Sequence, residues 1–404
     1  MRLWITGETP VPRDTLLIYV PAHLDNTPSD LPTMKPIRFL MIGGFLGAGK
    51  TTTIGRLARH FVDQGQRVGI VTNDQAYDLV DTLALRAQGF RVGEVPGACF
   101  CCKFDDLIET ARGLSADEVP DVILTEPVGS CTDLVATVIE PLRHLHGDRY
   151  EVAPLAVLLK PEHGRKILSG QAGAGFSPKA AYVFLKQIEE ADLVVINKID
   201  KLSAVERDGL ISLVAGRFPR KTILAISARG GEGFDALIDG LASAGPRHDR
   251  AMDVDYDVYA EGEAELGWLN CGVKLTAAGG EPPGEPFALD ELLLALVQRL
   301  GAALAECGAE VAHLKVFGEA HGAPAIANLV SSTSAAELSL ASEIKTGAAE
   351  LVVNARVAID PEILARIVTA EVAGLAEEDG LSHELTGMQH FRPGRPVPTH
   401  RMGN

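Results

Sequence analysis

One glycine-rich segment has the composition and spacing of a phosphate-binding loop. The residues Gly44-Phe-Leu-Gly-Ala-Gly-Lys-Thr51 match G-x-x-x-x-G-K-[ST] and stand between an apolar run and a helical pattern. In such a loop, backbone N–H groups approach phosphates and the helix N-terminus adds positive potential. We expect Lys50, as an exposed point charge, to reach the outer phosphates, and Thr51 to offer its hydroxyl to Mg²⁺. The alternative, a glycine-rich turn without a ligand, does not explain why strand, loop, lysine and threonine are aligned.

A second motif predicts which base is bound. Asn197-Lys-Ile-Asp200 ends an apolar run and matches the N-K-x-D motif of GTPases. Its acidic side chain can accept hydrogen bonds from N1–H and the 2-amino group of guanine, which adenine cannot offer together. This tetrapeptide alone is a common surface loop, but after a phosphate-binding loop it favours GTP over ATP. The predicted nucleotide contacts are Gly44, Gly47, Ala48, Gly49, Lys50, Thr51, Thr52, Asn197, Lys198, Asp200, and the pair Ser227 and Ala228, which follow the next apolar run.

Acidic residues at two further strand ends can position Mg²⁺ or a water molecule. Glu126-Pro-Val-Gly129 ends an apolar run, where P-loop proteins carry an acid that holds Mg²⁺ through water and a glycine that responds to the γ-phosphate. Asp74 ends the strand after the P-loop helix and could orient Mg²⁺ or the attacking water, with a turn or helix N-cap as the alternative. The predicted catalytic residues are Lys50, Asp74 and Glu126, and the predicted Mg²⁺ ligands are Thr51 and Glu126.

Three of the six cysteines crowd into one short segment, as Cys99, Cys101 and Cys102. Three thiolates at this spacing can nearly complete a tetrahedral shell for a soft or borderline ion such as Zn²⁺. The open fourth position would permit release of the metal. Cys131 could approach the same site, although isolated cysteines are usually core residues. Buried structural cysteines and a redox switch are the alternatives to a metal site.

These motifs require a parallel sheet to position them. From Ile37 to about Gly245, short apolar runs alternate with helical patterns, as in an α/β fold with a mostly parallel sheet and helices on both faces. Strands are expected at 37–42, 67–72, 121–125, 152–159, 192–197 and 222–226. Helices are expected at 50–60, 132–145, 180–190 and 204–218. The P-loop GTPase domain therefore spans residues 37–245.

A smaller domain is expected to follow. Residues 246–265 are acidic and lack a period, which indicates a linker, and residues 266–385 suit an α+β domain of ferredoxin-like type. Its expected strands are 268–275, 311–317, 325–331 and 351–357, and its expected helices are 289–307 and 361–375. Residues 1–36 read as an irregular extension. Residues 386–404 read as a proline-rich tail, either free or draped over the surface.

Composition narrows the class of partner. The chain has 404 residues, of which 46% are hydrophobic and 23% charged, as in soluble globular proteins. Its formal net charge of −17 would repel a phosphate backbone, so nucleic acid is not an expected partner. No run approaches the ~20 apolar residues that span a bilayer, so no membrane association and a cytoplasmic location are expected.

Taken in order, the four motifs resemble those of the CobW-like metal-chaperone GTPases, which are related to the urease and hydrogenase nickel-insertion GTPases. The resemblance covers residues 37 to about 245 well and the C-terminal domain in outline. It implies GTP binding and hydrolysis to GDP that gate a metal at the cysteines, a client metalloenzyme, and a GTP-dependent homodimer. Zn²⁺ is the expected metal, with Co²⁺, Ni²⁺ or Fe²⁺ as alternatives.

Some residues depart from the family pattern. Val71-Thr-Asn-Asp74 is closer to the urease accessory GTPase than to the usual Asn-Glu-Phe-Gly, and Ala98 replaces a usual glycine. These departures suggest a divergent subfamily with its own client.

Two other functions compete with a metallochaperone. No arginine finger can be assigned from the sequence, so hydrolysis is expected to be slow and stimulated by a metal or a partner. One competitor is a GTP-dependent regulatory module that senses metal or redox state. The other, a small-molecule kinase, is disfavoured by Asn197-Lys-Ile-Asp200.

Overall fold

The computed structural model describes residues 35–402 apart from 77–78, 116–117, 171–176, 247–250, 279–284 and 333. The irregular extension expected over residues 1–36 therefore lies almost wholly outside the described part. No helix among the described residues is long and apolar enough to cross a membrane.

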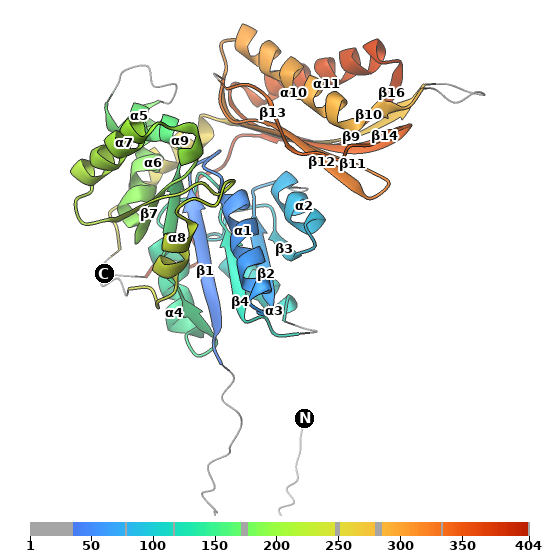
Figure 1. The fold of residues 1–404 in the computed structure, drawn as a ribbon. Helices are drawn as coiled ribbons and strands as arrows, with labels where there is room; N and C mark the ends of the chain where they lie inside the picture. The colour runs from blue at the N-terminus through green and yellow to red at the C-terminus, as the bar shows by residue number, and fades with distance from the viewer. Residues whose placement is uncertain are drawn as a thin grey trace, which may run out of the picture. The chain divides into compact units, whose positions relative to one another are not determined.

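A sheet of eight parallel strands carries the nucleotide motifs (Figure 1). Seven strands follow the order β3-β2-β4-β1-β6-β7-β8, and β5 also pairs with β1. The strands are β1 (Ile37–Gly44), β2 (Val68–Asn73), β3 (Arg91–Val95), β4 (Val122–Glu126), β5 (Tyr150–Val152), β6 (Ala156–Leu159), β7 (Leu193–Ile196) and β8 (Thr222–Ala225). The predicted α/β class is confirmed.

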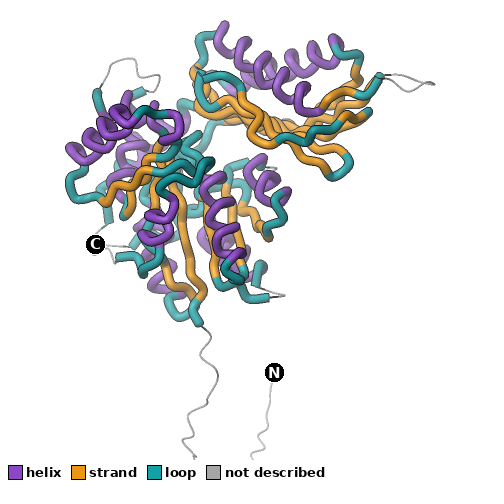
Figure 2. Tube along the Cα trace, viewed as in Figure 1, coloured by secondary structure: helices purple, strands orange, loops and turns teal. Residues whose placement is uncertain are grey.

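Helices cover both faces of this sheet (Figure 2). They are α1 (Lys50–Asp63), α2 (Val80–Ala87), α3 (Phe104–Gly113), a π-helical turn η1 (Val135–Ile139) that continues into α4 (Glu140–His146), α5 (Pro161–Leu168), α6 (Pro178–Glu190), a 3₁₀ turn η2 (Ile199–Lys201), α7 (Ala204–Arg217), α8 (Phe234–Leu241) and α9 (Tyr256–Ala264). Side chains alternate along β1: Phe39 and Met41 join the core beneath α3 and α6, whereas Leu40 and Ile42 join the core beneath α1 and α8. Because both faces are buried, the strands read as continuous apolar runs.

The second sheet is antiparallel and has the order β13-β12-β11-β15-β9-β16. Its elements are β9 (Gly267–Ala277), α10 (Leu289–Glu306), β11 (Glu310–Ala320), β12 (Ala323–Leu329), β13 (Glu337–Leu340), β15 (Ala348–Ala358), α11 (Pro361–Glu378) and β16 (Leu381–Phe391), with β10 (Phe287–Ala288) and β14 (Lys345–Thr346) forming a separate pair. The path β9-α10-β11-β15-α11-β16 is the split βαβ arrangement of a ferredoxin-like fold, extended by β12 and β13. The predicted α+β architecture is confirmed.

The two faces of the antiparallel sheet have different chemistry. Leu314 and Val316 of β11 belong to the core formed with α10 and α11, and both helices lie on that face of the sheet (Figure 1). Because side chains alternate along a strand, His313 and Lys315 lie on the other face. On this second face, Phe317 forms a small apolar cluster with residues of α2. The nucleotide-domain helix α2 therefore packs against the face that carries His313 and Lys315.

Three local assignments differ from the sequence prediction. The run 152–159, expected as one strand, is divided between β5 and β6, which both pair with β1. Helix α9 lies within the expected linker, where Asp255 caps its first turn and Tyr259 is buried. Strand β16 continues to Phe391, inside the expected tail. Its side chains are mostly only partly buried and give no apolar pattern, while its backbone pairs with β9. The domain boundaries themselves remain predictions.

Candidate functional site

The predicted phosphate-binding loop connects β1 to α1. Gly44 and Gly49 have φ angles of 132° and 92°, which favour glycine. A Cβ at Gly49 would lie 2.4 Å from Nδ2 of Asn197, so the loop and the guanine motif approach each other closely only because this residue is glycine. Lys50 is the first residue of α1, its side chain is only 7% exposed, and its Nζ lies 3.8 Å from Oε1 of Glu126. The expected exposed charge is therefore buried in an ion pair.

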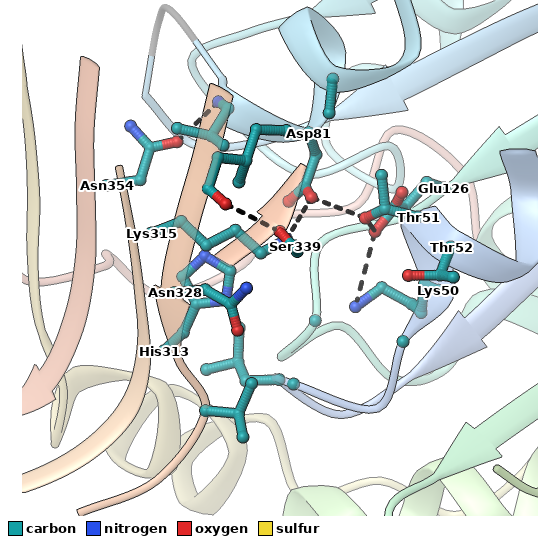
Figure 3. Close-up of a pocket in the computed structure, with 18 of the residues that line it drawn as sticks. Lys50, Thr51, Thr52, Asp81, Glu126, His313, Lys315, Asn328, Ser339 and Asn354 are labelled. Atoms are coloured by element: carbon teal, nitrogen blue, oxygen red, sulfur yellow. Dashed lines mark hydrogen bonds and ion pairs between the residues drawn. The ribbon is translucent and has the colours of Figure 1, made fainter. Parts of the chain in front are cut away.

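An oxygen cluster lies directly beside Lys50 (Figure 3). The hydroxyl of Thr51 lies 2.6 Å from Oδ1 of Asp81 and 3.1 Å from Oε1 of Glu126. Thr51 and Glu126, the predicted Mg²⁺ ligands, are thus adjacent. Asp81, in the first turn of α2, was not predicted, since no motif marks it.

The cluster has the donor set of an Mg²⁺ site. It offers one hydroxyl and two carboxylates, the hard oxygen ligands that Mg²⁺ prefers. Among the described residues, the buried Oε2 of Glu126 has no hydrogen-bond partner. Burial and the nearby Asp81 raise the pKa of Glu126 to about 7, and the charges of Lys50 and Lys315 oppose this rise. A further positive charge at the site would favour the ionised carboxylate. When bound, Mg²⁺ would supply that charge and neutralise phosphate oxygens.

Asp74 lies at the end of β2 and has different partners. Its Oδ1 accepts a hydrogen bond from the backbone N–H of Ala76, and its Oδ2 accepts one from Nη2 of Arg356 at 2.7 Å. Burial raises the pKa of Asp74, and Arg356 opposes this rise. Asp74 therefore has the turn role that was the alternative to a catalytic one, and it also forms an ion pair with Arg356 of β15. Its predicted catalytic role remains a proposal.

The guanine motif is tied to the phosphate loop by Asn197. Its Nδ2 donates to the carbonyl of Ala48 at 2.8 Å, and its Oδ1 accepts from the N–H of Ala228 at 2.9 Å. The hydroxyl of Ser227 donates to Oδ1 of Asp200 at 2.6 Å. Lys198 takes a left-handed conformation with a φ of 62°. These bonds bring the three predicted segments of the nucleotide site together.

A cavity of about 520 Å³ joins these segments and includes residues of the second sheet. It is lined by the predicted residues Gly47, Gly49, Lys50, Thr51, Thr52, Asp74, Glu126, Asn197, Lys198, Asp200 and Ala228, and by His313, Lys315, Asn328, Asn354 and Arg356 of the antiparallel sheet. Figure 3 shows Lys315 pointing toward Asp81 and Thr51. The second sheet therefore forms one wall of the candidate nucleotide site.

The three clustered cysteines lie between β3 and α3 with their sulfur atoms together. All three sulfurs lie within 4.8 Å of one another, and those of Cys101 and Cys102 are 3.7 Å apart. Sulfurs around a tetrahedral Zn²⁺, bound at ~2.3 Å each, are about 3.8 Å apart. Cys99 and Cys101 are only 2.8 Å apart and would separate as a metal binds. The donor set thus fits a thiophilic metal.

A fourth cysteine contacts this cluster. Hydrogen bonds with the thiols of Cys101, Cys102 and Cys131 hold the pKa of Cys99 well below its usual range. The hydrogen bond to Cys99 correspondingly raises the pKa of Cys131. Cys131 is buried beside the cluster, so it is both a core residue and a neighbour of the candidate metal site.

Asn73, the last residue of β2, holds the cysteine loop. Its Nδ2 donates to the carbonyls of Val95 and Ala98, each at 2.7 Å, and its Oδ1 accepts from the N–H of Phe100 at 2.8 Å. The next residue is Asp74, which lines the nucleotide cavity. One strand end therefore contacts both candidate sites.

The proline-rich tail crosses the cysteine loop. The N–H of Val397 donates to Sγ of Cys102 at 3.2 Å, and the N–H of Thr399 donates to the carbonyl of Cys101 at 2.8 Å. Further along, Arg401 pairs with Asp133 at 2.8 Å. The tail was predicted to be either free or in contact with the surface. Its described residues lie on the surface.

The fold and motif placement define a P-loop nucleotide-binding protein of the GTPase class. Residues 38–223 match the family model described as "CobW/HypB/UreG, nucleotide-binding domain". The match covers the segment that carries the four motifs, so the resemblance drawn from them is confirmed.

Individual relatives agree with this assignment. The zinc chaperone CobW of Pseudomonas aeruginosa is 27% identical over 243 residues, covering 52% of this chain and 61% of the relative. The zinc chaperone YeiR of Escherichia coli is 29% identical over 177 residues, covering 42% and 49%. The chain thus spans between about half and three fifths of the length of these relatives.

Solved structures also overlap with the chain. The hydrogenase maturation factor HypB from Archaeoglobus fulgidus has a TM-score of 0.37 and 19% identity, covering 51% of this chain and 89% of its own. The Zn(II)-bound YjiA GTPase from E. coli has a TM-score of 0.33 and 14% identity, covering 85% and 99%.

Proposed function

We propose that this chain is a GTP-binding, slowly GTP-hydrolysing metallochaperone or metal-insertion factor. Its metal, Zn²⁺ in the first instance, is held by Cys99, Cys101 and Cys102 and gated by GTP. The observation that carries this proposal is the position of Asn73, which holds the cysteine loop and precedes a residue of the nucleotide cavity. The zinc chaperones among the relatives support the choice of metal.

The proposed partner is a client metalloenzyme. Deleting the protein and measuring metal in the separated proteome should reveal one enzyme whose metal content falls. A proteome with unchanged metal occupancy would favour the regulatory module instead. Stimulation of GTP hydrolysis by added Zn²⁺, compared with Co²⁺ and Ni²⁺, would identify the cargo. A GTP-dependent homodimer is a further part of this proposal.

Replacing Asp200 by asparagine should weaken discrimination between GTP and ATP. We expect a loss of about 10- to 100-fold in GTP affinity, the value of one charge-assisted hydrogen bond. The variant should gain affinity for xanthosine triphosphate, whose 2-oxo group accepts a hydrogen bond where guanine donates one. Competition binding with the three nucleotides measures both effects, with the exposed Asp208→Asn as a matched control. An unchanged preference for GTP would show that the guanine motif is misassigned.

Removing residues 392–404 should loosen the metal site. The truncated chain loses the N–H that Val397 directs at Cys102 and both bonds that Thr399 makes with the loop. Because hydrogen bonds to charged groups contribute about 1.5–3 kcal/mol, we expect Zn²⁺ affinity to fall roughly tenfold or more. A chelator competition titration measures this, with Thr399→Val as the milder variant and GTP affinity as the test of folding. Equal Zn²⁺ affinity with and without the tail would exclude a role for these bonds.

A further inference from the structure

We propose that Lys315, on strand β11 of the C-terminal sheet, contacts the terminal phosphate of GTP and stabilises the charge that develops there during hydrolysis. The C-terminal domain would thus complete the nucleotide site in cis. This inference rests on the proposed GTPase function. It gives Lys315 the role of an arginine finger, for which no arginine can be assigned from the sequence.

The position of Lys315 carries the proposal. Its Nζ forms an ion pair with Oδ1 of Asp81, and the same oxygen lies 2.6 Å from the hydroxyl of Thr51. Thr51 directly follows the P-loop lysine, so the ammonium of Lys315 lies two hydrogen bonds away from the phosphate-binding loop. Figure 3 shows Lys315 reaching into the cavity from the side opposite Lys50.

The sheet holds Lys315 in this position through several contacts. On the opposing strand, Asn354 is its register partner, and Oδ1 of Asn354 accepts the N–H of Val80 at the start of α2. Phe317, two residues along β11, packs with α2 through the small apolar cluster. These contacts fix α2, and therefore Asp81, against the strand that carries Lys315.

Two arginines near the site are already committed to protein groups. Arg356 donates to the carbonyls of Leu269 and Ala355, to Asn270 and to Asp74. Arg56 donates to the carbonyls of Ala228 and Arg229. Lys315, in contrast, has one ion pair within the described part of the chain, and its side chain is 21% exposed. An exchange of Asp81 for another anion would therefore break a single ion pair.

A terminal phosphate is the anion for which such an exchange is favourable. It carries more charge than a carboxylate and offers several acceptor oxygens to an ammonium group. GDP lacks this phosphate, so Lys315 would return to Asp81 after hydrolysis.

The chemical step needs no proton from Lys315. The oxygen of water forms a bond to the γ-phosphorus while the bond from phosphorus to the β–γ bridging oxygen breaks. GDP leaves with that oxygen and its electron pair, and the proton of the water passes to the released inorganic phosphate. Lys315 contributes positive charge beside the equatorial oxygens, where charge accumulates in the transition state.

The test uses the full chain with Lys315→Met, which keeps an unbranched side chain but removes the ammonium, and Lys315→Arg, which keeps the charge. Affinities for GDP and for a non-hydrolysable GTP analogue are measured by equilibrium titration, and hydrolysis by single turnover. We expect Lys315→Met to slow hydrolysis by about 10²- to 10³-fold and to weaken analogue binding about tenfold, with GDP affinity unchanged. Lys315→Arg should keep most of both. Lys274→Ala, an exposed lysine of the same sheet outside the cavity, is the matched control.

Two results would overturn the inference alone. One is an unchanged hydrolysis rate and analogue affinity in Lys315→Met. The other is an equal loss of GDP and analogue affinity that Asn354→Ala reproduces, which would show that Lys315 only positions α2. Absence of GTP binding by the unmodified chain would overturn the proposed function, and this inference with it.

Discussion

Replacing Lys50 by alanine is expected to abolish GTP hydrolysis and to lower GTP affinity by about 10²-fold or more. The ammonium is the point charge of the phosphate-binding loop, and its charge-assisted bonds to phosphate oxygens have no substitute in alanine. The fold should tolerate the change. Without Lys50, the neighbouring Glu126 loses the 3.8 Å ion pair, but its pKa is already raised to about 7, so it can take up a proton near neutral pH.

Titration with a fluorescent GTP derivative, together with thermal unfolding, measures this result. Lys166→Ala on α5 is a matched control, because that lysine pairs only with Glu162 in the described structure and lies outside the lining of the nucleotide cavity. GTP binding by the Lys50 variant at the affinity of the unmodified chain would refute the nucleotide-site assignment. A large fall in unfolding temperature would instead indicate that the buried ion pair stabilises the fold.

The parallel sheet could be predicted because its strands are buried on both faces. Residues of β1 and β7 are almost all buried, so they appear in the sequence as uninterrupted apolar runs. Motifs at the ends of such strands then indicate which residues meet at one edge of the sheet. The ferredoxin-like domain was predicted for a related reason, since α10 and α11 each carry a clear apolar stripe.

The wall formed by the second sheet could not be predicted in the same way. Lys315 and Arg356 lie within strands that the sequence identifies only by their apolar residues. Which domain their polar face contacts depends on how α2 packs against β11, and α2 itself was not predicted. Asp81 belongs to α2, and its interaction with Thr51 follows from that packing. Local spacing contains no signal for such a contact.

The largest regulatory effect we expect is coupling between the two sites. The cysteines should bind one thiophilic metal per chain, and GTP should change that affinity by roughly 5- to 150-fold, the usual range of linkage. Two short routes support this expectation. Asn73, which directly precedes Asp74, bonds to the cysteine loop, and the segment from Gly129 to Cys131 links Lys50 to Cys99.

The second route is the more direct of the two. A Cβ at Gly129 would lie 3.1 Å from Nζ of Lys50, so a γ-phosphate that draws this lysine away changes the surroundings of Gly129. Two residues later, the thiol of Cys131 donates toward Cys99. Metal sites tolerate ligand displacements of only about 0.2 Å, so a small shift of either segment alters affinity.

Zn²⁺ competition titrations in three states test this coupling: with a non-hydrolysable GTP analogue, with GDP and without nucleotide. Zn²⁺ must change GTP affinity by the same factor, although the rate of hydrolysis need not follow. The triple Cys→Ser variant of Cys99, Cys101 and Cys102 should lose the metal while still binding GTP. Undiminished Zn²⁺ binding by that variant would remove the site, and equal Zn²⁺ affinity in all three states would leave a metal-binding GTPase without a gate.

Asn73→Ala separates the two routes. Its amide bonds to Val95 at the end of β3 and to Ala98 and Phe100 of the cysteine loop, and to no residue of the phosphate-binding loop in the described structure. If the coupling passes through Asn73, the factor by which GTP changes Zn²⁺ affinity should fall toward one in this variant. The GTP affinity measured without metal should stay constant. If the factor is unchanged, the coupling passes through Gly129 and Cys131, and Cys131→Ser should then reduce it instead. A factor that neither variant alters would exclude both routes.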